Sequence, residues 1–291
     1  MMKMKLIAIA LGGQDGAIWN KTLFRFNEKG LCRVYDLHSL AYESENTVEL
    51  PVSAEFYLDR APDFVPHCNA VMFGKEYYAD GDEFPLLYAN IYNNYAKNEN
   101  PYCGVCCVSR LQRKGNSFVT TLIQLIEIGF TADAHYWASS ETEKDRRPYG
   151  NFTIDTETGI YYAFTMRDHC NRSRYFAFTL PRKDDGIYDE AFGVNRVVLQ
   201  TSDIRWMFDC DYHHFVQGAC CHNGKIYSVE GFTDSAENQP ALRVIDPKLQ
   251  QQECYVRFAD HGATIEPEFI DFDGEVCLYG DGYGNLYKLD F

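Results

Sequence analysis

The 291-residue sequence lacks any apolar run long enough to cross a membrane as a helix. A membrane-spanning helix needs about 18 or more consecutive apolar residues. The apolar run near the N-terminus covers only residues 6–11, which is also shorter than the apolar part of a usual signal peptide, about 7 to 15 residues. We therefore interpret residues 6–11 as a β-strand.

The sequence is also poor in basic residues. It has 27 Lys and Arg residues against 42 Asp and Glu residues, a formal net charge of −15, and no basic stripe offsets this total. Nucleic acids and anionic membranes repel a protein of this charge. We therefore expect neither a nucleic acid nor a membrane as a partner.

Motifs of well-known catalytic and metal sites are missing. There is no Gly-x-Ser-x-Gly, no phosphate-binding loop, no Gly-x-Gly-x-x-Gly and no His-Glu-x-x-His. Residues 271–274 begin like a calcium loop but lack its later Glu, and we interpret them as a hairpin turn. Cys103 and Cys106 have no second pair at the spacing of a zinc knuckle, since residues 220–222 are spaced differently. We predict no metal and no cofactor.

Aromatic residues, in contrast, are abundant. The chain has 21 Tyr, 20 Phe and 3 Trp residues, 15% of the total, and aromatic side chains favour the half-buried surface of a sheet. No long segment has helical periodicity. Short apolar segments are instead separated by turn signals such as Asn223-Gly224 and Asp273-Gly274. The sequence therefore predicts an all-β protein.

A degenerate repeat runs along the chain. Residues 14–36 and 217–246 follow the same course and end in Arg-Val-Tyr-Asp and Arg-Val-Ile-Asp. Looser copies recur at intervals of roughly 50 to 80 residues, a spacing typical of propeller blades. The equivalent positions are Ala17, Ala70, Phe152, Ala219 and Phe269. Five such units predict a five-bladed β-propeller.

The ends of the chain suggest how the ring closes. The last unit has room for only three strands before Phe291, and the strand at residues 5–11 would supply its outer strand. We therefore expect one propeller domain spanning residues 1–291. The long interval between Ala70 and Phe152 leaves a six-bladed propeller open, and the irregular strands leave a β-sandwich open.

The eleven cysteines include two adjacent pairs, Cys106-Cys107 and Cys220-Cys221. Neighbouring residues of a strand point to opposite faces, so neither pair can form a disulfide without disrupting the strand. We expect reduced, mostly buried thiols. This usage favours a cytoplasmic protein, with a secreted protein as the alternative.

Polar residues recur just before the equivalent position of each repeat. The first strand of every blade lines the central channel of a propeller, so these residues should converge at one end of it. Because His214 and Gln217 are three positions apart, both can point into the channel only if the strand is irregular there. The candidate ligand-binding residues are Gln14, Asp15, His67, Asn69, Asn151, His214, Gln217, Glu266 and Glu268.

One repeat also has a family resemblance. Residues 214–218 (His-Phe-Val-Gln-Gly), 224–227 (Gly-Lys-Ile-Tyr) and 243–247 (Arg-Val-Ile-Asp-Pro) resemble five-bladed propellers related to teichoic-acid-biosynthesis proteins and phage receptor-binding proteins. The resemblance implies a propeller fold and a carbohydrate-facing channel. It carries over no catalytic residue.

These observations favour a propeller that binds a small polar ligand, such as a saccharide, at the mouth of its channel. A few convergent polar groups among aromatic side chains are typical of such sites. The alternatives are a glycoside hydrolase that uses Asp15, Glu266 and Glu268 as its carboxylates, and a scaffold for protein contacts. Whether the protein is an enzyme stays open at this point.

Overall fold

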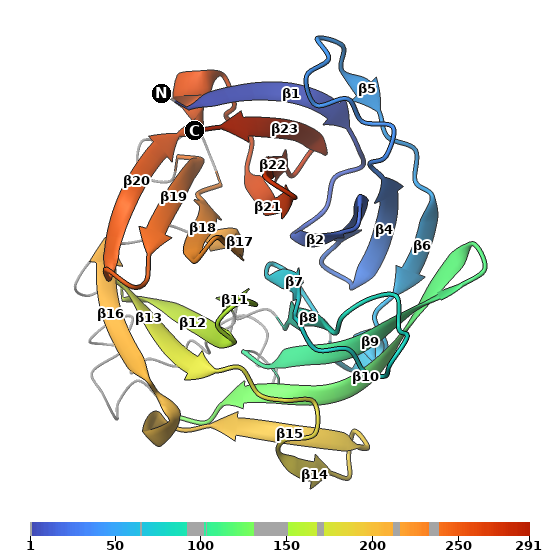
Figure 1. Cartoon of the computed structure of the whole chain (residues 1–291), viewed down its shortest axis with the longest axis vertical. Coiled ribbons are helices and arrows are strands. Elements are labelled where there is room, and N and C mark those ends of the chain that lie inside the picture. Colours follow the sequence, from blue (N-terminus) through green and yellow to red (C-terminus); the bar gives the residue numbers. More distant parts are fainter. Residues whose placement is uncertain are drawn as a thin grey trace.

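The computed structural model describes residues 2–64, 66–91, 102, 104–130, 151–167, 172–211, 216–232 and 239–291. Five sheets surround a common centre and form a five-bladed β-propeller (Figure 1). The predicted fold is therefore confirmed, and the six-bladed propeller and the β-sandwich are excluded. Within the described ranges, no helix is long and apolar enough to span a membrane.

The innermost strand of each blade carries one of the five positions that the repeat aligned, or begins directly after it. These strands lie nearest the centre in Figure 1 and are buried along most of their length, which explains their apolar and small residues. They are β2 (Gly16–Trp19), β7 (Val71–Phe73), β11 (Asn151–Asp155), β17 (Val216–His222) and β21 (Pro267–Asp273).

Three blades have four antiparallel strands each. Short turns join the strands, and Asn223 and Gly224 both have the positive φ that a two-residue hairpin turn requires. Outside the inner strands, the first blade contains β3 (Thr22–Phe26), β4 (Leu31–Asp36) and β6 (Ala54–Tyr57); the third contains β12 (Ile160–Arg167), β13 (Arg172–Thr179) and β16 (Trp206–Asp211); the fourth contains β18 (Lys225–Glu230), β19 (Ala241–Asp246) and β20 (Gln251–Arg257).

The second blade is larger, with six strands. A long hairpin extends it outwards, and the outer strand of that hairpin pairs in parallel with a strand that belongs, in sequence, to the third repeat. This hairpin accounts for part of the long interval that left a sixth blade open. The strands from the centre outwards are β7, β8 (Leu87–Asn90), β9 (Cys106–Lys114), β10 (Ser117–Ile128), β15 (Val194–Leu199) and β14 (Ile187–Asp189).

The fifth blade joins the two ends of the chain. Strand β1 (Lys3–Ile9) pairs antiparallel with β23 (Asn285–Asp290), and Leu6 lies opposite Tyr287. Strand β22 (Val276–Asp281) lies between β21 and β23, and the short β5 (Val48–Glu49) pairs in parallel with the outer side of β1. Both termini therefore lie on the same side of the ring (Figure 1).

Side chains between neighbouring blades form the core. Each of the five blade interfaces has its own apolar cluster, for example Phe24 and Phe26 of the first blade against Phe73 and Phe118 of the second. Helical elements are short: α1 (Ala61–Phe64) and the 3-10 turns η3 (Thr201–Asp203) and η4 (Phe258–His261).

The cysteines contribute to this core as thiols. No disulfide joins the nine that lie within the described ranges to one another, and seven of them are buried. This agrees with the expectation of reduced, mostly buried cysteines. Cys103, which the sequence offered as part of a zinc site, lies outside the described residues.

Candidate functional site

Neighbouring inner strands lie in contact around the centre of the ring. Strand β2 packs against both β7 and β21, and β17 packs against β11 and β21. Hydrogen bonds between side chains then join residues that are more than 250 positions apart in the sequence. The candidate cluster therefore consists of residues at the starts of inner strands.

Asp15 lies deepest in this region, fully buried directly before β2. Its Oδ2 atom accepts a hydrogen bond from the backbone amide of Val71 in β7 at 2.9 Å. A Cβ atom added to Gly218 of β17 would lie 3.0 Å from Asp15 Oδ1. The carboxyl group thus lies between three blades. Burial raises its pKa well above the usual range, although the Val71 amide acts in the opposite direction.

Glu268 lies at the start of β21 and is 4% exposed. Gln14 Nε2 donates a hydrogen bond to Glu268 Oε1 at 3.0 Å. Burial, together with the nearby charge of Glu266, raises the pKa of Glu268 to about 9, while Arg25 and the Gln14 bond act in the opposite direction. Glu268 is therefore protonated at neutral pH. From the sequence we expected the negative charge of Asp15 to raise this pKa; the largest such effect comes from Glu266 instead.

Glu266 and Gln217 lie nearer to the solvent. Both are half-buried, and Gln217 Nε2 donates a hydrogen bond to Glu266 Oε1 at 2.6 Å. This bond joins the fourth blade to the fifth. Burial raises the pKa of Glu266.

Irregular strand pairing positions the side chains of Gln217 and Glu268. The register shifts between Val216 and Gly218 in β17, and between Pro267 and Phe269 in β21. Gln217 and Glu268 are the extra residues at these shifts. Such bulges redirect side chains and are common beside active sites. The strand is thus irregular at Gln217, as both Gln217 and His214 would require in order to point into the channel. His214 itself lies outside the described residues.

The structure adds Arg25, which the sequence analysis did not select. Its guanidinium is buried in β3 and donates to the backbone carbonyl oxygens of Gly13, Gln14 and Asp281, at 3.3, 3.2 and 2.6 Å. Burial lowers the pKa of Arg25, and Glu268 is the strongest of the nearby carboxylates that oppose this effect. A single charged residue in the otherwise apolar stretch of residues 23–26 was the available signal.

The other predicted residues lie outside this hydrogen-bonded network. The amide of Asn90 donates to Asn69 Oδ1 at 2.5 Å, so Asn69 supports its own blade. Burial lowers the pKa of the half-buried His67, and the charge of Glu28 on the first blade acts in the opposite direction. Asn151 begins β11 and is buried, and its Oδ1 atom has no hydrogen-bond partner among the described residues.

Three further oxygen atoms of the site are buried without a partner in the described part of the chain. They are Gln14 Oε1, Asp15 Oδ1 and Glu268 Oε2. Buried polar atoms are normally hydrogen-bonded to protein or water. The donor Arg25 Nη1 is also buried without a partner among these residues. The cluster therefore has unused hydrogen-bonding atoms of both kinds, and the half-buried Gln14, Gln217 and Glu266 give it access to solvent.

The described residues offer no site for a metal ion, because no group of three or more His, Cys, Asp or Glu side chains has a suitable arrangement there. The cluster consists of carboxyl and amide groups together with the buried guanidinium of Arg25. It can accept and donate hydrogen bonds, and Glu268 can release a proton.

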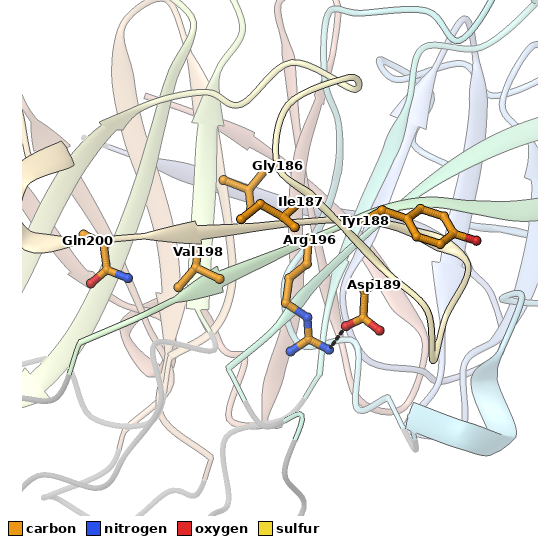
Figure 2. A pocket seen from close by; sticks show the side chains of 8 residues that line it. Gly186, Ile187, Tyr188, Asp189, Arg196, Val198 and Gln200 are labelled. Atoms are coloured by element: carbon orange, nitrogen blue, oxygen red, sulfur yellow. Dashed lines mark ion pairs between the residues drawn. The ribbon is translucent and has the colours of Figure 1, made fainter.

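A separate hollow of about 600 Å³ lies at the outer edge of the second blade, lined by residues of β14 and β15 and their flanks (Figure 2). Ile187, Tyr188 and Val198 line it together with Arg196. The Arg196 guanidinium is already paired with Asp189 at 2.7 Å and with Glu127 at 2.9 Å. Both charged side chains that line this hollow, Arg196 and Asp189, are therefore already paired.

The fold is a five-bladed propeller, and the cluster joins carboxyl and amide groups from three of its blades. No protein-family model matches the chain, and no curated protein matches it. Among solved structures, the glutaminyl cyclase of Myxococcus xanthus is similar at a TM-score of 0.47 and 10% identity, with 99% of this chain and 94% of that chain covered.

The Dos1 propeller is similar at a TM-score of 0.35 and 10% identity, and the match covers 92% of this chain but 53% of that one. These likenesses concern the arrangement of strands and carry no functional information. The fold implied by the family resemblance is confirmed. The comparisons give no support for a relation to teichoic-acid-biosynthesis or phage receptor-binding proteins.

Proposed function

We propose that this protein binds a small polar ligand, a mono- or oligosaccharide, at the end of the channel where the inner strands begin. The observation that carries the proposal is the convergence of Gln14, Asp15, Gln217, Glu266 and Glu268 from three blades, with oxygen atoms left unpartnered. Carboxyl and amide groups suit sugar hydroxyls, which both donate and accept hydrogen bonds.

Thermal unfolding with a panel of saccharides tests this proposal. A ligand present at about 100 times its dissociation constant stabilises the folded state by about 2.7 kcal/mol, so a binding saccharide should raise the melting temperature as its concentration increases. Replacing Gln217 with Ala should weaken this response, because it removes the bond to Glu266. Gln251→Ala is the matched control, since Gln251 is exposed on β20 of the same blade. A panel without any concentration-dependent shift would contradict the proposal.

One observation favours glycoside hydrolysis as a second function. Glu268 is protonated at neutral pH and lies near a second carboxyl group, Glu266. Glycosidases require such a proton donor and a second carboxylate. Incubation with a saccharide that binds should then produce new reducing ends. Glu268→Gln should abolish this turnover while the saccharide still binds, and binding without any reducing ends would leave the protein a binder only.

A further inference from the structure

Strand β14 forms the outer edge of the second blade, and none of its side chains is buried. Ile187 is 81% exposed, more than any other large hydrophobic side chain in the described ranges, and Tyr188 is 60% exposed. One side of β14 pairs with β15, and no strand of the described residues pairs with its other side. Apolar side chains on an unpaired sheet edge favour the addition of another strand.

This edge is nevertheless fixed in position by the sheet behind it. The side-chain amide of Gln124, fully buried in β10, donates hydrogen bonds to the backbone carbonyl oxygens of Arg182 and Asp185, at 2.7 and 3.0 Å. In β15, Asn195 Nδ2 donates to the carbonyl oxygen of Asp184 at 3.1 Å. The segment that leads into β14 is therefore preorganised, and an edge that is already ordered loses little conformational entropy on binding.

The two exposed apolar residues lie on opposite faces of the sheet. Ile187 is paired with Arg196 of β15, so it shares a face with Val198, and both line the hollow of about 600 Å³ in Figure 2. A strand added to β14 would place one side chain beside Ile187 and the next beside Tyr188. Apolar side chains suit both positions, because the Arg196 guanidinium is already paired with Asp189 at 2.7 Å.

The flanks of β14 are acidic. Residues 182–190 contain four acidic residues against two basic ones. Lys183 is paired with Asp184 at 2.7 Å, whereas the exposed Asp185 and Glu190 form no ion pair within the described part of the chain. A second copy paired along this edge would bring like charges together, and each copy has a net charge of −15. The charge therefore favours a basic partner over a second copy.

We infer that β14 binds an extended basic segment of another protein as an added strand. This segment has apolar side chains where it lies beside Ile187 and Tyr188, and Lys or Arg residues at both ends, beside the acidic flanks. Main-chain hydrogen bonds would supply the affinity, and the side chains the specificity. The edge shares no residue with the carboxyl and amide cluster, so the inference is independent of saccharide binding.

Fluorescence anisotropy with the full chain and a labelled peptide provides the test. The probe is Lys-Arg-Thr-Val-Val-Thr-Arg-Lys, and it should bind saturably. The charge-reversed peptide Glu-Glu-Thr-Val-Val-Thr-Glu-Glu should bind at least about tenfold more weakly. Raising NaCl from 50 to 500 mM should weaken binding of the basic probe, because salt screens exposed charges. Absence of binding by the basic probe, or equal binding of both peptides, would overturn the inference.

Pairing through the backbone is tested with two N-methylated versions of the basic probe. Each version carries methyl groups on alternate amides, so the methyl groups of the two versions lie on opposite edges of an extended peptide. Only one edge of an added strand faces β14. One version should therefore lose binding by at least about tenfold while the other retains it, and equal affinities of the two versions would overturn strand addition. These measurements use the wild-type protein alone.

Variants of the chain then locate the site. Ile187→Ser and Glu190→Lys should each weaken binding of the basic probe by about fivefold or more. Both side chains are exposed, so the changes leave the core intact. Val119→Ser, at an exposed position on β10 of the same blade, is the matched control and should have no effect. Sedimentation equilibrium should show a monomer; a dimer that Ile187→Ser dissociates would identify a second copy as the occupant and overturn the inference.

Discussion

Replacing Glu268 with glutamine should change how the stability of the protein depends on pH. The carboxyl group of Glu268 has a pKa of about 9 in the folded protein against an ordinary value of 4.5, and burial is the largest cause. Glutamine has nearly the same shape and cannot ionise. Its side-chain oxygen can still accept the hydrogen bond from Gln14, so the variant keeps the packing and loses only the titration.

The sign follows from proton binding. Below pH 4.5, Glu268 is protonated in both the folded and the unfolded states and contributes no pH dependence. Between pH 4.5 and about 9, the unfolded chain has lost this proton while the folded protein retains it. The free energy of unfolding therefore decreases as the pH rises. One group changes it by about 1.4 kcal/mol per pH unit, which amounts to about 3 kcal/mol between pH 5 and pH 7.5.

Urea denaturation at several pH values between 5 and 8.5 measures this effect. The wild-type protein should lose stability more steeply than Glu268→Gln, so the variant should become the more stable protein at the upper end of the range. Burial also raises the pKa values of Asp15, Glu266 and Asp271, and these groups lower the stability of both proteins as the pH rises. The difference between the two profiles isolates Glu268. Glu49→Gln should follow the wild type. Parallel profiles for the wild type and Glu268→Gln would refute the buried, protonated state of Glu268.

Three further predictions concern the surroundings of the site and the ring, and urea denaturation measures each. Gly218→Ala should lower the free energy of unfolding by about 1 to 3 kcal/mol, because the added methyl group would press on the buried carboxyl group of Asp15. Gly282→Ala should change stability little, since the nearest atom to its added Cβ would be 3.6 Å away. Equal effects of the two changes would contradict the close approach of β17 to Asp15. Arg25→Met should lower the free energy of unfolding by about 3 to 5 kcal/mol, because it removes a buried charge and leaves three backbone carbonyl oxygens without their donor. Arg172→Gln, at a more exposed position, should change this free energy by less than about 1 kcal/mol. An Arg25 variant as stable as the wild type would show that these bonds do not stabilise the fold. Ile7→Ala on β1 should cost about 2 to 5 kcal/mol as a buried core residue, and a negligible loss would show that β1 is not part of the core.

The positions of the inner strands could be predicted from the sequence. Each of the five aligned residues lies in an inner strand or directly before one, because every blade must place a short apolar strand at the crowded centre and begin it with a turn. That requirement repeats along the chain, so a degenerate repeat is enough to reveal it. The convergence of Gln14, Asp15, Gln217, Glu266 and Glu268 follows from the same rotation of equivalent positions about one axis.

The composition of the second blade could not be predicted in this way. Strands β14 and β15 interrupt the third repeat and pair instead with β10 of the second. Pairing between strands from different repeats depends on which sheet edge is free when the blades are packed together. No local pattern in the sequence records that edge.

The chemistry of the site was likewise decided by tertiary structure. The sequence determined which polar residues stand at the starts of the inner strands, because a repeat fixes position along the chain. It did not determine that Glu268 and Gln217 lie at bulges, that Glu266 rather than Asp15 adds to the raised pKa of Glu268, or that Arg25 is buried against backbone carbonyls. Bulges, burial and the distances between charges arise only when three blades pack around one axis. These three features set the protonation states in the cluster and leave some of its hydrogen-bonding atoms without a partner.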